Sequence, residues 1–175
     1  VAPSCFVYQS PAGNVLCVAC HYEVTPERAV AWGRCLMANI APKQVCILDS
    51  GLAANLRGSE TGTSGVLALH SKQQTAPLLA CEALPQPNLV EGAAAALMLQ
   101  CIYRDIAASV FISFAERHAG LAAAQPFGAV LDCVEGLAGG DFESTLQEMA
   151  ASQQRFVGAQ ANDTHLSKAH NNLFA

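Results

Sequence analysis

The apolar positions near the N-terminus fall into two short runs separated by turn-forming residues. Cys5–Tyr8 and Val15–Tyr22 are rich in β-forming residues, whereas Gln9–Asn14 between them contains proline, glycine and asparagine. Strand-forming runs that flank such a segment are typical of a hairpin. The pattern therefore predicts two antiparallel strands at the start of the chain.

A helical period follows the hairpin. Thr25 can act as an N-cap and Pro26 can occupy the first helical position. Apolar residues then recur at helical spacing, at Ala29, Trp32, Leu36 and Ile40. Pro42 ends this helix, and the almost wholly apolar run Gln44–Leu48 is typical of a central strand covered on both faces. A helix that leads into such a strand predicts an α/β layer.

The second half of the chain alternates between loops, helices and strands. Gly51–Gly65 is polar and rich in glycine, which predicts a loop. Asn88 can cap an alanine-rich helix that has Glu91 at its third position and ends at Arg104. The other expected elements are a strand or helical turn at Val66–His70, a buried strand at Ser109–Phe114, and helices at Gln125–Leu137 and Asp141–Phe156.

Together these elements predict a single α/β domain, a layered mixed sheet with flanking helices, over residues 1–156. A chain of 175 residues is long enough for one sizeable core and needs no second domain. Residues 157–175 are mostly polar and have no helical period, so they predict a flexible C-terminal tail.

The surface is expected to carry few charges. Charged residues make up 13% of the chain, about half the usual share of a soluble domain, while hydrophobic residues make up 52%. This composition predicts that part of the surface is buried against another protein. A net charge of -5 and no basic stripe argue against nucleic acid or a membrane surface as partner, and no apolar run approaches the length of a membrane span.

Eight cysteines lie mainly in strand and helix patterns, which favours free thiols in a reducing cytosol or nucleus. Cys17, Cys20 and His21 match the pattern of covalent haem attachment. However, residues three apart on a strand point to opposite faces, so the two thiols cannot both reach one porphyrin. We expect no cofactor and no metal, and a thiol-redox or metal-binding role for these three residues is an alternative hypothesis.

The sequence offers no pattern of catalytic residues. A nucleoside-phosphorylase or hydrolase type of enzyme remains the rival class, since α/β layers host such activities. Its pocket would use Asp49, Glu60 or His70. No nucleophile elbow or phosphate-binding fingerprint accompanies these residues, and we expect that the chain is not an enzyme.

The chain ends in Leu173, Phe174 and Ala175, which follow a polar stretch. Terminal residues are usually solvated unless something binds them. An aromatic side chain beside the terminal carboxylate therefore indicates a plug, either for the domain itself or for a partner.

The order of segments resembles the family of heterodimeric proteasome assembly chaperones, in particular its first subunit. The segments that carry the resemblance are the cysteine-rich hairpin, the helix around Trp32, the Val45–Leu48 strand, the Ser59–Gly62 loop, Pro77–Leu79, Gln86–Val90 and the Val110–Phe114 strand. The resemblance covers most of the chain from residue 5 onward, and Gln86-Pro87-Asn88-Leu89-Val90 is its most specific part.

The resemblance implies a chaperone that pairs with a second assembly chaperone subunit and binds the outer face of the proteasome α-ring. The family ends in a hydrophobic residue, a tyrosine and one terminal residue, which enter a pocket between neighbouring α-subunits. Leu173 takes the hydrophobic place, Phe174 the tyrosine place and Ala175 the terminal place. Phenylalanine keeps the aromatic ring but lacks the phenolic hydroxyl. The implied action is to promote ring assembly and to block premature binding of activators.

Overall fold

The computed structural model describes residues 5–10, 14–20, 24–58, 65–75, 79–115 and 124–134. These residues belong to one compact unit, Val1–Gly140. The predicted helix Asp141–Phe156 and the predicted tail lie outside the described residues. The boundary at residues 156 and 157 therefore stays a prediction.

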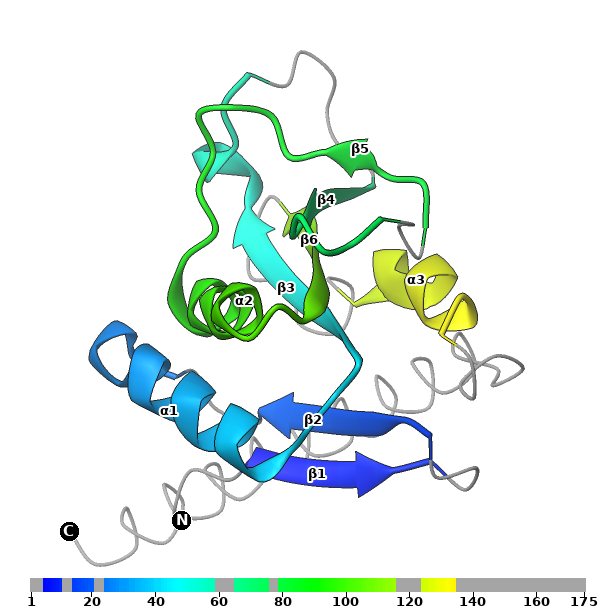
Figure 1. Cartoon of the computed structure of the whole chain (residues 1–175). Coiled ribbons are helices and arrows are strands. Elements are labelled where there is room, and N and C mark those ends of the chain that lie inside the picture. The colour runs from blue at the N-terminus through cyan, green and yellow to red at the C-terminus, as the bar shows by residue number, and fades with distance from the viewer. Residues whose placement is uncertain are drawn as a thin grey trace, which may run out of the picture. The chain divides into compact units, whose positions relative to one another are not determined.

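The predicted hairpin is confirmed. Strands β1 (Cys5–Gln9) and β2 (Leu16–Cys20) pair antiparallel and form a two-stranded sheet of their own (Figure 1). The Ser10 amide donates a 2.9 Å hydrogen bond to the Val15 carbonyl and closes the turn end of the hairpin. No residue of either strand is buried, so this sheet contributes little to the core.

The main sheet has four strands in the order β3-β6-β4-β5. Their bounds are β3 Gln44–Leu52, β4 Val66–His70, β5 Glu82–Ala83 and β6 Ala107–Ala115. The pairs β3–β6 and β4–β5 are parallel, whereas β4 and β6 are antiparallel. The predicted mixed sheet of an α/β fold is thus confirmed (Figure 1).

The prediction that Gln44–Leu48 is a central strand was wrong. Strand β3 lies at the edge of the sheet, and Ile47 is its only buried residue. The central position belongs to β6, whose residues Ala108–Ser113 are all buried. An apolar run alone does not distinguish an edge strand from a central strand. A central strand has a pairing partner on each side, and those partners come from distant parts of the chain.

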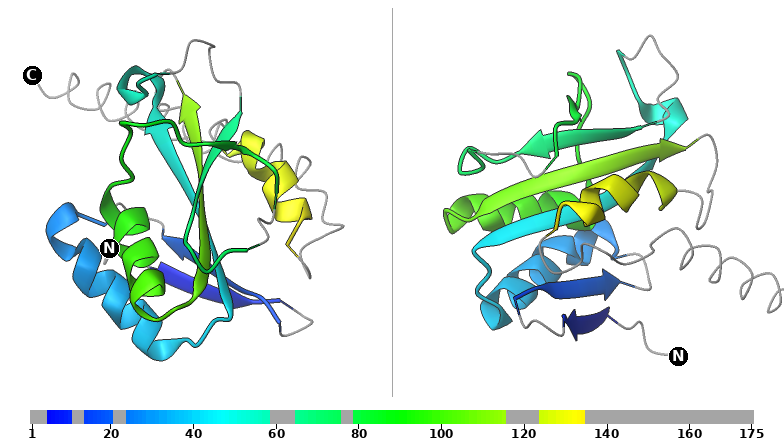
Figure 2. Two further views of the ribbon diagram at one scale, coloured as in Figure 1. Left: turned by 45° about the horizontal axis from the view of Figure 1, so that its top comes forward. Right: turned by 90° about the vertical axis from the view of Figure 1, so that its right-hand side faces the viewer.

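Helices cover both faces of this sheet. Helices α1 (Pro26–Asn39) and α2 (Gly92–Tyr103) pack together on one face. The 3₁₀ turn η3 (Gln125–Phe127) and the short helix α3 (Gly128–Asp132) lie on the other face, as Figure 2 shows. Another 3₁₀ turn, η1 (Ala53–Asn55), follows β3. No described helix has the length and hydropathy of a membrane span.

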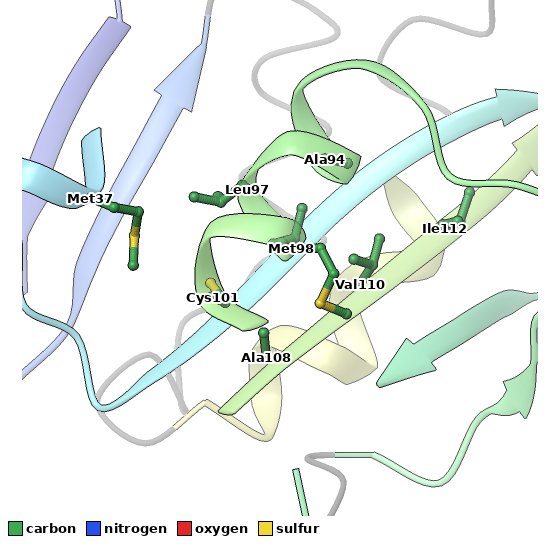
Figure 3. Packing of buried hydrophobic residues seen from close by; sticks show 9 residues of the cluster. Met37, Ala94, Leu97, Met98, Cys101, Ala108, Val110 and Ile112 are labelled. Carbon is green, nitrogen blue, oxygen red and sulfur yellow. The ribbon is translucent and has the colours of Figure 1, made fainter. Parts of the chain in front are cut away.

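The larger core lies between the sheet and helices α1 and α2 (Figure 3). Alternate residues of β6 point to this side, and the buried members are Met37, Ile47, Ala94, Leu97, Met98, Cys101, Ala108, Val110 and Ile112. Gly33 on α1 lies against the backbone of Ala96 on α2, where an added Cβ would meet the Ala96 carbonyl carbon at 3.5 Å. Small residues thus let the two helices approach closely.

The smaller core lies on the opposite face of β6. Phe111 is fully buried there, and Ala68, Phe127 and Val130 are the other buried members. Because successive side chains of a strand alternate between faces, Val110 and Phe111 belong to different cores. This alternation also decides which candidate site residues can meet.

Candidate functional site

Helix α2 exposes an apolar face. Its twelve residues include no charged side chain, and one side packs into the larger core. The other side carries Leu99, Ile102 and Tyr103, whose exposed fractions are 45%, 45% and 77%. These positions share one helical face because they are three and four residues apart. A helix that is apolar all round is normally buried on all sides, so this outer face has the character of a protein-binding surface.

The loop before α2 is held in place by Asn88. Its Oδ1 accepts a 2.8 Å hydrogen bond from the Arg57 amide, and its Nδ2 donates to the carbonyls of Arg57 at 2.7 Å and Pro85 at 2.6 Å. The prediction that Asn88 caps the helix was wrong, because α2 begins at Gly92 with Glu91 at the N-cap position. The neighbouring Leu89 is 81% exposed on this braced loop.

Replacing Asn88 with alanine is expected to lower the free energy of unfolding by about 1–3 kcal/mol, because two hydrogen bonds to the separate Arg57 loop and one to Pro85 in its own loop are lost. Urea denaturation followed by circular dichroism measures this change. Asn39→Ala is the matched control, since exposed Asn39 makes a local hydrogen bond to the Cys35 carbonyl on its own helix. Equal losses for the two variants would contradict a bracing role for Asn88.

Asp49 and His70, the two described residues of the rival enzyme hypothesis, lie on opposite faces of the main sheet. Asp49 is in register with Ile112, a member of the larger core, and therefore lies on the face of the sheet that packs into that core. His70 is in register with Ser109 and faces the smaller core. Burial raises the pKa of Asp49, and a 2.9 Å hydrogen bond from the Ser50 amide opposes that rise. The third residue, Glu60, lies outside the described residues.

His70 does meet a serine, but not in a catalytic arrangement. His70 Nδ1 and Ser109 Oγ share a 2.8 Å hydrogen bond between opposite residues of β4 and β6. Ser109 is fully buried, so its hydroxyl cannot reach a substrate. The edge-on contact of the His70 ring with Phe111 indicates packing as well. This pair satisfies a buried hydroxyl within the sheet.

The hairpin separates the residues of the haem-like motif. Cys17 pairs with Tyr8, and Cys20 pairs with Cys5. Their odd spacing puts Cys17 and Cys20 on opposite faces, as the sequence predicted. His21 lies outside the described residues. In the part of the chain that is described, no three potential ligands gather into a metal site.

The terminal plug residues Leu173, Phe174 and Ala175 also lie outside the described residues. The structure instead reveals two features that sequence reasoning missed, the outer face of α2 and the Cys5–Cys20 pair. The absence of charge from Gly92 to Tyr103 was a signal for the first. For the Cys5–Cys20 pair, the signal was the strand register, which can be counted outward from the predicted turn of the hairpin.

The architecture was compared with known proteins. No protein-family model and no curated protein matches the chain. Among solved structures, PbaA of Pyrococcus furiosus, described as an archaeal homolog of proteasome-assembly chaperone, aligns with a TM-score of 0.64 at 15% identity over 99% of this chain and 74% of its own. PbaB of the same organism, described as an archaeal proteasome activator, gives 0.57 at 13% identity over 90% and 70%.

A protein of unknown function from Thermoplasma acidophilum aligns equally well, with a TM-score of 0.64 at 14% identity over 94% of this chain and 68% of its own. At sequence identities of 13–15%, these alignments show a shared fold alone. The chain therefore has the α/β fold found in these archaeal proteins. Two of the three are described in connection with the proteasome.

Proposed function

We propose that the chain is a subunit of a proteasome core-particle assembly chaperone and not an enzyme, with the role of proteasome assembly chaperone 1. The observation that carries the proposal is the fold shared with PbaA over 99% of this chain. The sequence resemblance points to the same family independently, through segments such as Gln86–Val90. A cytosolic or nuclear place of action agrees with the abundance of free cysteines.

The partner in this proposal is a second, related chaperone subunit that covers the outer face of α2. Exposed apolar side chains support this assignment, because water contact at Leu99, Ile102 and Tyr103 is unfavourable in the isolated chain. Burial of one such side chain contributes about 1.5–3 kcal/mol. Three of them contribute at most about 9 kcal/mol, which is comparable to the cost of association, so in this proposal they form the centre of a larger contact.

The second contact in the proposal is the tail. Leu173 and Phe174 enter a pocket between α-subunits, and the Ala175 carboxylate is captured there. The tail alone should bind at about millimolar to high micromolar levels, because burial of two side chains is offset by ordering costs. The 16 residues between Phe156 and Leu173 form a tether that spans roughly 20–24 Å if flexible. A docked body then raises the local concentration of the plug, which promotes ring assembly and blocks activators.

Affinity purification of the full chain from its own cells, followed by mass spectrometry, tests the proposal. We expect a second chaperone subunit and proteasome α-subunits to co-purify. Leu99→Glu should lower recovery of the second subunit about tenfold or more, because it puts a charge into an apolar contact. Leu48→Glu is the matched control, since Leu48 is similarly exposed on the opposite sheet face.

Recovery of neither partner would contradict the proposed function. Recovery that falls equally for Leu99→Glu and Leu48→Glu would contradict the assignment of the α2 face. The enzyme hypothesis makes a different prediction, that nucleosides or phosphate raise the melting temperature of the purified chain. We expect no such shift.

A further inference from the structure

Two cysteines face each other at the open end of the hairpin. Cys5 and Cys20 are the last pair in the β1–β2 register, 15 residues apart in sequence. Their sulfur atoms lie 3.4 Å apart. Both residues are exposed and both are free thiols. The pair therefore combines proximity with access from solvent.

The strand register makes this position suitable for a disulfide bond. The hydrogen bond from the Ser10 amide to the Val15 carbonyl marks Ser10–Val15 as a hydrogen-bonded pair. Hydrogen-bonded and non-hydrogen-bonded pairs alternate along an antiparallel ladder, so counting outward makes Cys5–Cys20 a non-hydrogen-bonded pair. Such pairs have Cα atoms about 4.5 Å apart, which lies within the range that a disulfide spans. Rotation of the side chains is then sufficient to form the bond.

We propose that Cys5 and Cys20 form a reversible redox site that is oxidised by a low-molecular-weight disulfide of the glutathione class. One thiolate attacks a sulfur of the small disulfide, whose S–S bond breaks and releases one small thiol. The second cysteine then attacks the protein sulfur of the mixed disulfide and releases the other small thiol. Two protein thiols are oxidised, the small disulfide is reduced to two thiols, and the two thiol protons pass to the released thiols.

The surroundings of Cys20 disfavour its thiolate form. Burial, followed by the hydrogen bond and charge of Cys5, raises the pKa of Cys20 to about 11. Cys20 is therefore almost wholly protonated at neutral pH and is a poor first nucleophile. The closeness of the two sulfur atoms lets either cysteine resolve a mixed disulfide that forms on the other.

The bond would change the hairpin more than any other described element. A two-stranded sheet is marginally stable by itself, and neither strand of this one has a buried residue. The turn at Ser10–Val15 closes one end, and the disulfide would close the other. Oxidation thus fixes a hairpin that carries exposed side chains on both faces, Phe6 and Tyr8 on one and Val7 and Leu16 on the other. This effect goes beyond the proposed chaperone function and does not depend on it.

The test uses the purified full chain in buffers with increasing ratios of oxidised to reduced glutathione. Samples are quenched with acid, free thiols are alkylated, and chymotrypsin separates Cys5 from Cys20 by cutting after Phe6 or Tyr8. Cys17→Ser is the matched control. Cys17 is an exposed thiol on β2, the strand of Cys20, but its partner in the register is Tyr8 and not a cysteine. Cys5→Ser and Cys20→Ser each remove one member of the pair.

We expect the wild-type chain and Cys17→Ser to form a Cys5–Cys20 disulfide, seen as linked peptides and a mass lower by about 2 Da. Neither single variant of the pair should form a disulfide within the hairpin. Cys20→Ser should instead accumulate a glutathione adduct on Cys5. Hydrogen exchange of the hairpin amides should slow about tenfold or more on oxidation of the wild-type chain, with no change in Cys5→Ser.

Several outcomes would overturn the proposal. If Cys5 and Cys20 stay as alkylatable as Cys35, an exposed thiol on α1 that serves as reference, in the most oxidising buffer, no disulfide has formed and the proposal is wrong. Linkage of Cys5 to Cys17, or of two chains to each other, would also refute it. Circular dichroism of each variant verifies that the fold is intact.

Discussion

Removal of Leu173, Phe174 and Ala175 is expected to lower the affinity for immature α-ring particles about a hundredfold or more, while the second chaperone subunit stays bound. The reason is that a tethered plug and a docked body bind together far more tightly than either alone, commonly by a factor of 10² to 10⁴. Loss of the plug leaves only the body contact. Calorimetric titration or a quantitative pull-down with isolated α-ring particles measures the difference.

Two variants serve as controls for this deletion. Asn171→Ala changes the polar tether without touching the plug and should leave the affinity unchanged. Phe174→Tyr introduces the tyrosine of the family that the sequence resembles and should raise the affinity by up to about tenfold through a hydrogen bond from its hydroxyl in the proposed pocket. Unchanged affinity after deletion of all three residues would refute the plug, but would leave the α2 contact and the redox pair untouched.

Replacing Phe111 with alanine is expected to lower the free energy of unfolding by about 3–5 kcal/mol, the usual cost of removing a buried aromatic side chain. Phe111 has no exposed surface and lies in the central strand against Ala68, Phe127 and Val130. A loss of this size is a large part of the total stability of an ordinary domain. Urea denaturation measures it through the transition midpoint at constant slope.

Phe6→Ala provides the matched comparison, because the Phe6 side chain is 46% exposed in the hairpin. Its expected cost is below about 1 kcal/mol. Phe111→Leu should fall between the two, since it refills part of the cavity. Equal losses for Phe111→Ala and Phe6→Ala would contradict the division between a packed sheet and an exposed hairpin.

The sequence predicted those elements whose signals are local. The turn residues before Val15 and the β-forming runs beside them predicted the hairpin, and Pro26 with its helical repeat predicted α1. Local patterns did not predict features that depend on contacts with distant segments. Gln44–Leu48 reads as a central strand, yet β3 is an edge, and Asn88 reads as a cap, yet it braces Arg57.

The same distinction between local and long-range features applies to the candidate sites. Three features follow from the sequence alone: the apolar end of the chain, the low share of charged residues and the opposite facing of Cys17 and Cys20. Each depends on composition or on the two-residue period of a strand. The pairing of β3 and β4 with β6 placed Asp49 and His70 on different faces of the sheet, and the register of the hairpin placed Cys5 opposite Cys20. The tertiary structure also decided which side of α2 is left uncovered. The Cys5–Cys20 contact depends on one local hairpin. The placement of Asp49 and His70 and the exposed side of α2 instead depend on pairing and packing between segments distant in sequence, which the burial of side chains from the whole chain fixes.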